Sequence, residues 1–396
     1  MTDPILIAGA GIGGLTAGLA LLRRGHAVRI LEQASQLGEV GAGLQLSANA
    51  TRALHLLGLS RALADVAVQP TGKEIRLWST GQTWKLFDLG DSSVAEYGYP
   101  YYTLYRPDLH RVLVDAIRSI APDAIHLGAR CERFEQTDDG VRLTMADASV
   151  HAGRVLVGAD GVHSSVRRQL FGEGPATYAG CMAWRGVIPV DRLDPQVVRQ
   201  VGTNWVGPGR HVIHYPLRGG RLMNFVGIVE TDRWAAESWT QRGSHAECHA
   251  DFDGWHPDIH ELIRHIDVPY RWALMARPAL ERWTDRRVTL LGDACHPTLP
   301  FLAQGAGMAI EDGFVLGRAL SDIDDPLQAL QRYEAARIDR TTAIVEKSTE
   351  NGRRFHNPEL ASASGAAAYV DREWSPQRVR ERYGWLFEYR VDEVVV

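Results

Sequence analysis

Two regular spacings of apolar residues alternate along this 396-residue chain. Residues 4–9 form a continuous apolar run with the length of a buried strand, and a glycine-rich turn follows it. Residues 15–25 then carry apolar side chains at helical spacing, and residues 27–32 form a second apolar run. Strand, helix and strand in this order predict a βαβ unit at the N-terminus.

The rest of the chain continues the alternation of strand and helix patterns. Apolar and polar positions alternate over residues 181–230, which is typical of strands whose two faces differ in burial. The other predicted elements are a helix at 106–120, a hairpin of strands at 131–136 and 141–146 with its turn at 138–140, buried strands beginning at 154 and 288, and helices over 303–352. The predicted fold class is α/β: a Rossmann-like domain interleaved in sequence with an antiparallel-sheet domain, with helices at the C-terminal end.

Composition and charge narrow the classes of function. The net charge of −5 and the pI near 6.3 give no dominant basic surface, so nucleic acid is not an expected partner. No apolar stretch is long enough to span a bilayer, and no positive segment precedes the first apolar run, so we expect a cytoplasmic protein. The four cysteines form no CxxC pair, so neither disulfides nor a metal site is expected.

The turn after the first strand carries the spacing GxGxxG in Gly9, Gly11 and Gly14. Glycines at these positions let the backbone approach a pyrophosphate, and the following helix N-terminus directs free N–H groups at the anion. Glu32, at the end of the second strand, is placed to bind a ribose diol. Tight packing alone can also require glycines, but strand, helix and acidic residue together favour a dinucleotide site.

Two later motifs follow buried strands and carry an aspartate. These are GADGVHSSVR at residues 158–167 and GDACHP at residues 292–297. Asp293 is a candidate for binding the ribitol hydroxyls of a flavin, and its alternative role is that of a turn or helix-capping aspartate.

The three motifs GAGIGG, GADG and GDACHP, the last followed by QGAGMAIED, stand in the order and spacing of a known family. The chain resembles the group A flavoprotein monooxygenases, the family of para-hydroxybenzoate hydroxylase, over most of residues 1–350. The resemblance implies FAD as cofactor and NADH or NADPH as cosubstrate. It also implies that Arg106 lies near the flavin, with a solvated helix-start arginine as the alternative. The cofactor-binding residues that follow from it are Gly9, Gly11, Gly14, Glu32, Gln45, Arg106, Asp160, Asp293, Gly305, Gly307 and Met308.

The stretch HVIHYPL suggests the substrate side of the site. In a strand His211, Ile213 and Tyr215 share one face, and His214 lies on the other. At about 3.3 Å per residue His211 and Tyr215 lie roughly 13 Å apart, so their side chains can converge on one aromatic ring. His211 and Tyr215 are therefore the candidate catalytic residues, although a strand histidine is more often a core or surface residue.

Three segments resemble particular branches of the family. GRHVIHYPLRGG and EVGAGLQLSANA (residues 39–50) are similar to 3-hydroxybenzoate 6-hydroxylases, and CMAWRG (181–186) to salicylate and hydroxybenzoate hydroxylases. Gln45 stands where 6-hydroxynicotinate monooxygenases carry a histidine. Pro300 departs from the glutamine expected of a 3-hydroxybenzoate enzyme, and Gln304 is either a substitute donor or a helix-start residue.

The predicted function is that of an FAD-dependent monooxygenase that uses NADH and O₂ to hydroxylate a monohydroxylated aromatic acid. 3-Hydroxybenzoate to 2,5-dihydroxybenzoate is favoured; the alternatives are salicylate to catechol, or a flavin-dependent oxidoreductase acting on another small aromatic or heteroaromatic. A homodimer is a candidate assembly. We expect an FAD-binding domain from residues 1–72, 97–178 and 272–350, a substrate domain from 73–96 and 179–271, and a C-terminal tail over 351–396 joined by a flexible ASASGAAA segment at 361–368.

Overall fold

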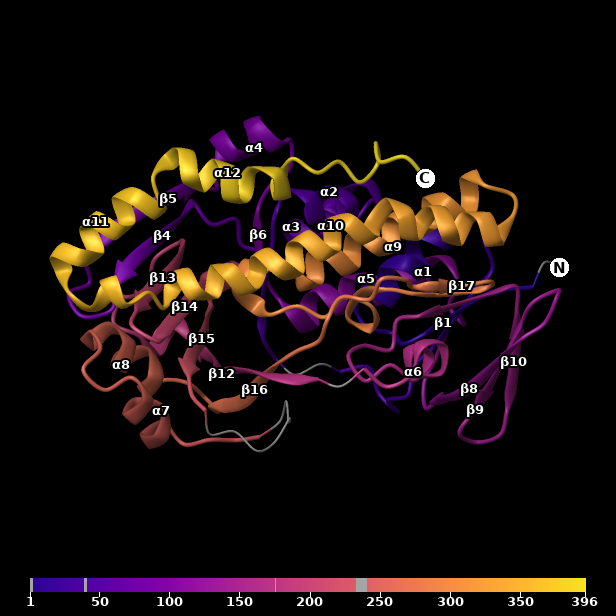
Figure 1. Ribbon diagram of the computed structural model, residues 1–396, viewed down its shortest axis with the longest axis horizontal. Helices are drawn as coiled ribbons and strands as arrows, with labels where there is room; N and C mark the ends of the chain where they lie inside the picture. Colours follow the sequence, from indigo (N-terminus) through magenta and orange to yellow (C-terminus); the bar gives the residue numbers. More distant parts are fainter. Residues whose placement is uncertain (1–2, 39–40, 175, 233–240) are drawn as a thin grey trace.

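Two large sheets lie side by side in the computed structural model, which describes residues 3–38, 41–174, 176–232 and 241–396 (Figure 1). Residues 39–40 of the segment EVGAGLQLSANA lie outside the described residues. The first sheet has six strands in the order β17(Thr284–Asp285), β18(Val288–Leu290), β11(Val155–Gly158), β1(Ile5–Ala8), β2(Val28–Leu31) and β7(Ile125–His126). The second has seven, in the order β16(Tyr270–Ala276), β12(Thr177–Pro189), β15(Leu222–Glu230), β14(Arg210–Leu217), β13(Val201–Gly207), β4(Gly72–Leu77) and β5(Thr83–Asp88).

The first sheet confirms the predicted βαβ unit. Strand β1 pairs in parallel with both β2 and β11, and every one of its residues is buried. Helix α1(Ile12–Leu22) connects β1 to β2 and packs against α9(Gly305–Asp322). An apolar strand buried on both faces is what a parallel sheet covered by helices requires. The continuous hydrophobic run of β1 is therefore explained by its central position in the six-stranded sheet.

The second sheet is antiparallel except where β13 pairs in parallel with β4. Strand β12 separates two groups of side chains. Met182 and Trp184 face the apolar core beneath α7(His245–Asp251) and α8(Pro257–Arg264). Cys181 and Ala183 face the opposite side, with Trp272 of β16. The alternating pattern of residues 181–230 thus comes from a sheet with a different environment on each face.

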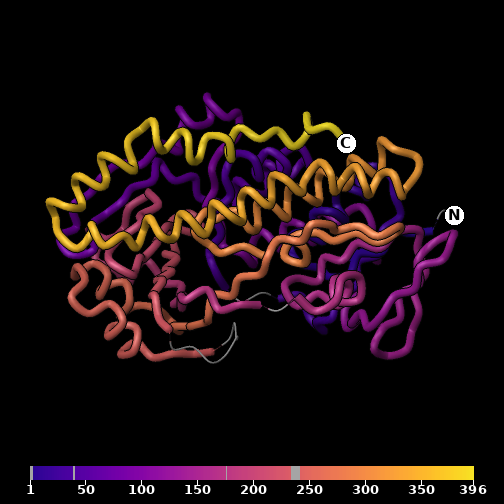
Figure 2. Tube along the Cα trace, viewed as in Figure 1, coloured from indigo at the N-terminus to yellow at the C-terminus, as the bar shows by residue number. Residues whose placement is uncertain are grey.

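Helix α10(Pro326–Phe355) runs diagonally across both halves of the molecule (Figure 2). Its first half packs on α9, and its second half reaches the segment at 299–301, where Ser348 and Asn351 donate hydrogen bonds to backbone carbonyls. The helix therefore ties the two sheets together.

The expectation of a flexible join at residues 361–368 is wrong. Helix α11(Ala363–Glu373) covers most of this segment, and the Ser362 hydroxyl caps it by accepting a hydrogen bond from the Gly365 N–H. Ala366 and Tyr369 are buried with residues of α12(Pro376–Phe387), so burial of this small-residue face, rather than its composition, decides the structure. In Figure 1 both helices lie along the edge of the molecule that β4 and β5 occupy.

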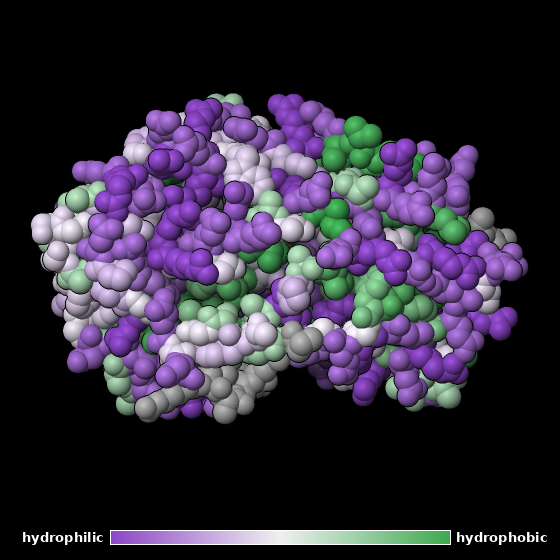
Figure 3. All heavy atoms as spheres, in the orientation of Figure 1, coloured by the Kyte–Doolittle hydropathy of each residue, from purple (hydrophilic) through white to green (hydrophobic). Residues whose placement is uncertain are grey.

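The surface of the molecule is mostly hydrophilic on the face in Figure 3, with smaller hydrophobic areas mainly in the right half of the view. Among the described residues, no helix is both long and apolar enough to cross a membrane.

The other helices and strands complete the two halves of the molecule. They are β3(Gly43–Leu46), β6(Tyr102–Tyr105), β8(Cys131–Gln136), β9(Val141–Met145), β10(Val150–Gly153), α2(Ala48–Leu56), α3(Ser60–Ala64), α4(Asp91–Tyr97), α5(Arg106–Ile120) and α6(Ser165–Phe171).

Candidate active site

A cavity of about 380 Å³ extends from the glycine turn before α1 to one face of strand β14. Gly11 and Gly13 line one end, and His211 and Tyr215 line the other. The lining near β14 is largely apolar, with Ile213, Val226 and Trp272 among its members. One continuous space therefore connects the predicted dinucleotide site with the predicted substrate strand.

The glycine turn is built for close backbone contact. Gly9 has a φ of 106°, and a Cβ on it would lie 2.4 Å from the Ala159 carbonyl oxygen. A Cβ on Gly14 would lie 2.1 Å from the carbonyl oxygen of Gly9, which fixes how tightly α1 follows β1. At Gly11 a Cβ would meet open space instead, at the N-cap of α1. An anion can thus approach the free N–H groups of this helix.

Glu32 stabilises the backbone of the same glycine turn. Its carboxylate accepts hydrogen bonds from the backbone N–H groups of Ala10 and Ala34, at 2.8 and 2.9 Å. His110 contacts the turn as well, through a ring nitrogen 2.8 Å from the Ala10 carbonyl oxygen. These contacts hold the loop between β1 and α1 in its observed shape.

The two motif aspartates occupy different places. Asp293 is exposed and lines the cavity. Asp160 lies beside the N-terminus of α6, where its carboxylate accepts a hydrogen bond from the Ser165 N–H at 2.8 Å. Its neighbours Ala159, Gly161 and Val162 are the residues of this motif that line the cavity.

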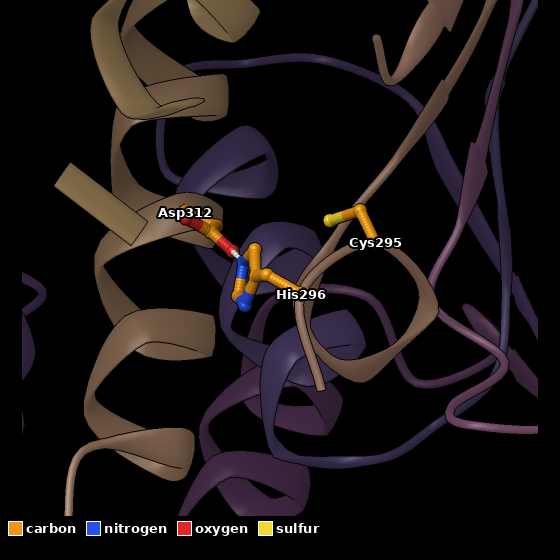
Figure 4. A group of neighbouring side chains, drawn as sticks. All are labelled: Cys295, His296 and Asp312. Atoms are coloured by element: carbon orange, nitrogen blue, oxygen red, sulfur yellow. Dashed lines mark hydrogen bonds and ion pairs between the residues drawn. The ribbon is translucent and has the colours of Figure 1, made fainter. Parts of the chain in front are cut away.

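A buried polar cluster anchors the GDACHP segment to α9 (Figure 4). The Nε2 atom of His296 lies 2.6 Å from Asp312, and Arg337 donates to the other carboxylate oxygen at 2.7 Å. Burial by itself would raise the pKa of Asp312, but His296 and Arg337 together lower it. Burial also raises the pKa of Cys295, so this thiol stays neutral. Although Cys295, His296 and Asp312 offer atoms within 4.8 Å of one another, the carboxylate is already paired, and we interpret the cluster as an anchor.

The N-terminus of α9 borders the cavity through Gly305. Gly307 and Met308 are buried, and the side of Gly307 that a Cβ would occupy faces Gln304 and α2. Gln304 is the N-cap residue of α9, and its amide is hydrogen-bonded to Ser47 and Asn49. The interpretation of Gln304 as a helix-start residue therefore holds, and Pro300 lines the cavity together with its neighbours Thr298 and Leu299.

Strand β14 presents His211, Ile213 and Tyr215 to the cavity. His214 is on the opposite face, where its Nε2 accepts a hydrogen bond from the Trp205 indole at 3.1 Å. His211 and Tyr215 are 1% and 3% exposed, so any group they contact must lie inside the cavity. Burial raises the pKa of Tyr215, which keeps its hydroxyl protonated.

Strand β3 supports this end of the cavity. A Cβ on Gly43 would lie 2.7 Å from the Tyr215 ring, so the ring can pack here because the residue is glycine. Gln45 lines the cavity, and its side-chain oxygen accepts a hydrogen bond from the Tyr101 hydroxyl at 2.9 Å.

Two arginines from different elements line the same cavity. Arg106 is the first residue of α5, and Arg185 lies in the middle of β12. Burial, and then the positive charge of Arg106, lower the pKa of Arg185 to about 10. The Arg185 guanidinium also stacks on Trp272, 4.2 Å from the ring centroid. Two cations beside an apolar cavity create a positive potential that suits an anion.

The sequence patterns did not single out Arg185. It lies within CMAWRG, a segment that matched the family as a whole, and a charged residue in an otherwise apolar strand was the available signal. Arg185 follows Cys181 and Ala183 at intervals of two residues, so it shares their face of the strand. Met182 and Trp184 are on the opposite face, toward the apolar core.

The glycine turn, its open approach at Gly11 and the adjoining cavity are typical of a dinucleotide-binding α/β protein with a largely apolar pocket next to the dinucleotide site. A family model described as an FAD binding domain matches residues 2–348. The chain belongs to this family and is a group A flavoprotein monooxygenase.

Curated relatives match over nearly the whole chain. The 3-amino-4-hydroxybenzoate 2-monooxygenase PtnB3 of Streptomyces platensis is 37% identical, covering 98% of this chain and 97% of that protein. The 3-hydroxybenzoate 6-hydroxylase of Polaromonas naphthalenivorans is 36% identical, covering 98% and 96%. The crystal structure of Klebsiella pneumoniae HpxO with FAD and uric acid matches with a TM-score of 0.82 at 27% identity, covering 98% and 96%.

The residues present fit FAD. Gly9 and Gly14 shape a turn that side chains would block, and Gly11 leaves the N-terminus of α1 open to a pyrophosphate. Asp293 and Gly305 line the part of the cavity that continues toward β14. These residues would hold FAD, and its redox chemistry would serve the same cavity that His211 lines.

Proposed function

We propose that the protein hydroxylates a benzoate that carries an electron-donating group on its ring, with NADH or NADPH as the reductant and O₂ as the oxidant. The observation that carries the proposal is the continuity of one cavity, which is lined by glycines of the turn before α1, by two arginines and by the His211 and Tyr215 pair. 3-Hydroxybenzoate, converted to 2,5-dihydroxybenzoate, is the preferred substrate.

The names of the relatives support this substrate class. Both 3-amino-4-hydroxybenzoate 2-monooxygenase and 3-hydroxybenzoate 6-hydroxylase are named for a benzoate with a nitrogen or oxygen donor at C3. Both names also place the new oxygen on a ring carbon next to the carbon that bears the carboxylate. A site shared with these proteins would hold the carboxylate firmly and present the adjacent ring carbon to the flavin.

In the proposed complex the substrate carboxylate pairs with Arg185, with the positive charge of Arg106 nearby. A charge-assisted hydrogen bond inside a cavity with few other polar groups is stronger than the same bond in water. Trp272 restricts the guanidinium by stacking on it, so less side-chain freedom is lost when the anion binds. The carboxylate would thereby fix the orientation of the ring.

His211 is proposed as the base that removes the proton from the ring hydroxyl. An ionised hydroxyl makes the ring electron-rich, which favours its attack on an electrophilic oxygen. Bound FAD, once reduced by the nicotinamide, supplies activated oxygen from O₂ to the ring. Ile213, Val226 and Trp272 exclude water from this end of the cavity. Tyr215, protonated because of its burial, can donate a hydrogen bond to a substrate oxygen.

The test is a comparison of aromatic acids with the FAD-loaded protein. 3-Hydroxybenzoate, 3-amino-4-hydroxybenzoate, salicylate, 4-hydroxybenzoate and phenol are supplied at equal concentration, and NADH oxidation and product structure are measured. We expect the C3-substituted acids to give stoichiometric hydroxylated product and phenol to give little. Phenol turning over as well as the best acid would refute carboxylate recognition, and catechol from salicylate as the main product would shift the substrate to salicylate.

A further inference from the structure

A second cavity, of about 620 Å³, lies near the end of strand β15. Glu230, His356 and Arg353 line it, together with Leu299 and Phe301. Glu230 is an exposed residue, with 53% of its side chain accessible. This second cavity therefore brings solvent to the carboxylate of Glu230.

Three side chains connect the two cavities through hydrogen bonds. His211, which lines the substrate cavity, has its Nδ1 atom 2.6 Å from the Nε2 atom of His356. The Nδ1 atom of His356 lies 2.7 Å from the Oε1 atom of Glu230. Both distances are within the range of strong hydrogen bonds. This series of hydrogen bonds runs from the His211 ring, which is 1% exposed, to the Glu230 carboxylate, whose side chain is 53% exposed to solvent.

The direction of these hydrogen bonds follows from the chemistry of the groups when His356 is neutral. A carboxylate can only accept, so His356 must carry a proton on Nδ1. The Nε2 atom of a neutral His356 is then an acceptor, and His211 must donate to it from Nδ1. This arrangement leaves the lone pair of His211 on Nε2, the ring nitrogen available to a ligand in the substrate cavity. His211 is thereby held in the tautomer that a base requires.

Apolar rings surround the inner part of the chain. Phe355 and Phe301 lie 5.1 and 5.6 Å from the His211 ring, measured between centroids. They enclose the His211 ring, whereas His356 borders the second cavity, so a proton leaves His211 through its hydrogen bond to His356. The second cavity, where Glu230 lies, is also lined by other charged and titratable groups. These are Cys181 of β12, Arg353 of α10 and Asp232 after β15.

We propose that His211, His356 and Glu230 form a proton relay that carries the proton of the bound substrate hydroxyl to solvent through the second cavity. This inference rests on the proposed function of His211 as the base. His356 and Glu230 act through His211 and do not touch the substrate.

The transfer is balanced along the chain. The substrate O–H bond breaks and its proton forms an N–H bond at Nε2 of His211, while the Nδ1 proton of His211 passes to Nε2 of His356. The Nδ1 proton of His356 passes to Glu230, which releases a proton to water. The result is a phenolate in the substrate cavity and one proton in solvent. Transfer in the reverse direction returns a proton to the product oxygen and restores both tautomers.

The environment of His211 explains why a proton that this base accepts must pass on to another group. Burial, and then the neighbouring His356, lower the pKa of His211 well below its ordinary value. A ring of such low basicity cannot store a proton taken from a phenol. The hydrogen bond from His356 lowers the pKa of Glu230, so this carboxylate is ionised at neutral pH and releases to water any proton that it receives.

The relay is tested in the FAD-loaded protein with Glu230→Gln and His356→Gln. Each variant is mixed rapidly with 3-hydroxybenzoate in weak buffer that contains a pH indicator dye, and proton release is timed against the absorbance of the bound phenolate. We expect both variants to slow the two signals about 10-fold or more, while the dissociation constant of the acid changes less than about 3-fold. Imidazole buffer, which can enter the second cavity, should accelerate Glu230→Gln in proportion to its concentration.

Asp232→Asn is the matched control, because Asp232 is a carboxylate beside the same cavity but outside the chain of hydrogen bonds. It should release the proton at the wild-type rate. Flavin content and melting temperature establish that each variant is folded. Wild-type rates in Glu230→Gln, or slowing that imidazole does not relieve, would overturn the relay.

A second measurement keeps failure of the relay distinct from failure of the proposed function. Nitrogen-15 spectra of the FAD-loaded protein, with ring-labelled histidine and no substrate, report the tautomers directly. We expect the protons of both His211 and His356 to be on Nδ1. A proton on Nε2 of His211 beside a neutral His356 would overturn the relay even if hydroxylation is observed. The expected tautomers in a protein that hydroxylates none of the acids would support the relay geometry and refute the proposed substrate class.

Discussion

Arg185 and Arg106 line one cavity from different elements, and the charge of one lowers the pKa of the other. Placing two guanidinium groups together is unfavourable unless an anion offsets their repulsion. In the proposed complex the carboxylate of the aromatic acid supplies such an anion beside this pair.

Replacing Arg185 by Met should weaken binding of the aromatic acid about 10-fold to 100-fold, because a charge-assisted hydrogen bond inside the cavity is lost. FAD content should not change. Titration of the flavin absorbance with 3-hydroxybenzoate measures the effect. Arg192→Met, which removes an exposed arginine paired with Asp267, is the control and should leave the dissociation constant as in the wild type. Equal affinity in Arg185→Met and the wild type would remove Arg185 from carboxylate binding.

His211→Asn should slow hydroxylation about 10²-fold to 10⁴-fold, the usual contribution of a positioned general base. FAD and the acid should still bind, and more of the NADH consumed should yield hydrogen peroxide instead of product. Product and peroxide are quantified per NADH consumed. His265→Asn, at the C-cap of α8 and paired with Glu261, serves as the control. Unchanged rate and unchanged product yield in His211→Asn would return His211 to the role of a core histidine.

The stability of the protein should fall as the pH falls below about 6.5, and His214 should be one cause. Burial, and then Arg76 and Arg199, lower the pKa of His214 to about 3. The unfolded chain therefore binds a proton that the folded chain excludes, and the contribution of this histidine is complete above the unfolded pKa and is lost as the pH falls toward 3. One such group changes the free energy of unfolding by about 1.4 kcal/mol per pH unit within this window.

Urea unfolding at several pH values measures this dependence. His214→Gln, which retains an acceptor for the Trp205 indole but does not titrate, should show a shallower slope than the wild type between pH of about 4 and 6. Identical slopes in the two proteins would assign the acid sensitivity to other groups.

The anchor between GDACHP and α9 should matter for both folding and cofactor binding. Arg337→Met removes the arginine that bridges the buried carboxylates of Glu311 and Asp312 and leaves them with Arg340 and His296 respectively, which should cost about 3 kcal/mol of unfolding free energy. FAD affinity should fall as well, because Asp293 loses its fixed position. Arg372→Met, at an exposed ion pair with Glu359, should cost less than about 1 kcal/mol. Equal unfolding free energies for the two variants would show that the cluster is not an anchor.

Local patterns predicted the nucleotide-binding half well, because its motifs lie on consecutive elements. The run of residues 4–9 is buried on both faces of β1, and the glycine turn with Glu32 follows from strand, helix and strand in order. The period of two in HVIHYPL similarly placed His211 and Tyr215 toward one space. Each of these inferences needs information from fewer than about thirty neighbouring residues.

Contacts between distant segments could not be read in this way. His356 follows a long helix, and nothing nearby indicates that its ring lies 2.6 Å from His211, which is 145 residues earlier. The helix α11 was missed for a related reason, since the small residues of ASASGAAA become helical where Ala366 and Tyr369 are buried against α12. Arg185 became a candidate when the cavity placed it with Arg106.

The most direct measurement is the fate of molecular oxygen. The FAD-loaded protein is supplied with NADH, 3-hydroxybenzoate and ¹⁸O₂, and the aromatic product is examined by mass spectrometry. We expect 2,5-dihydroxybenzoate that carries one oxygen-18 atom, formed in equal amount to the NADH consumed. NADH oxidation that yields hydrogen peroxide alone, with no labelled aromatic product from this acid or from 3-amino-4-hydroxybenzoate, would contradict the hydroxylase function proposed for this cavity.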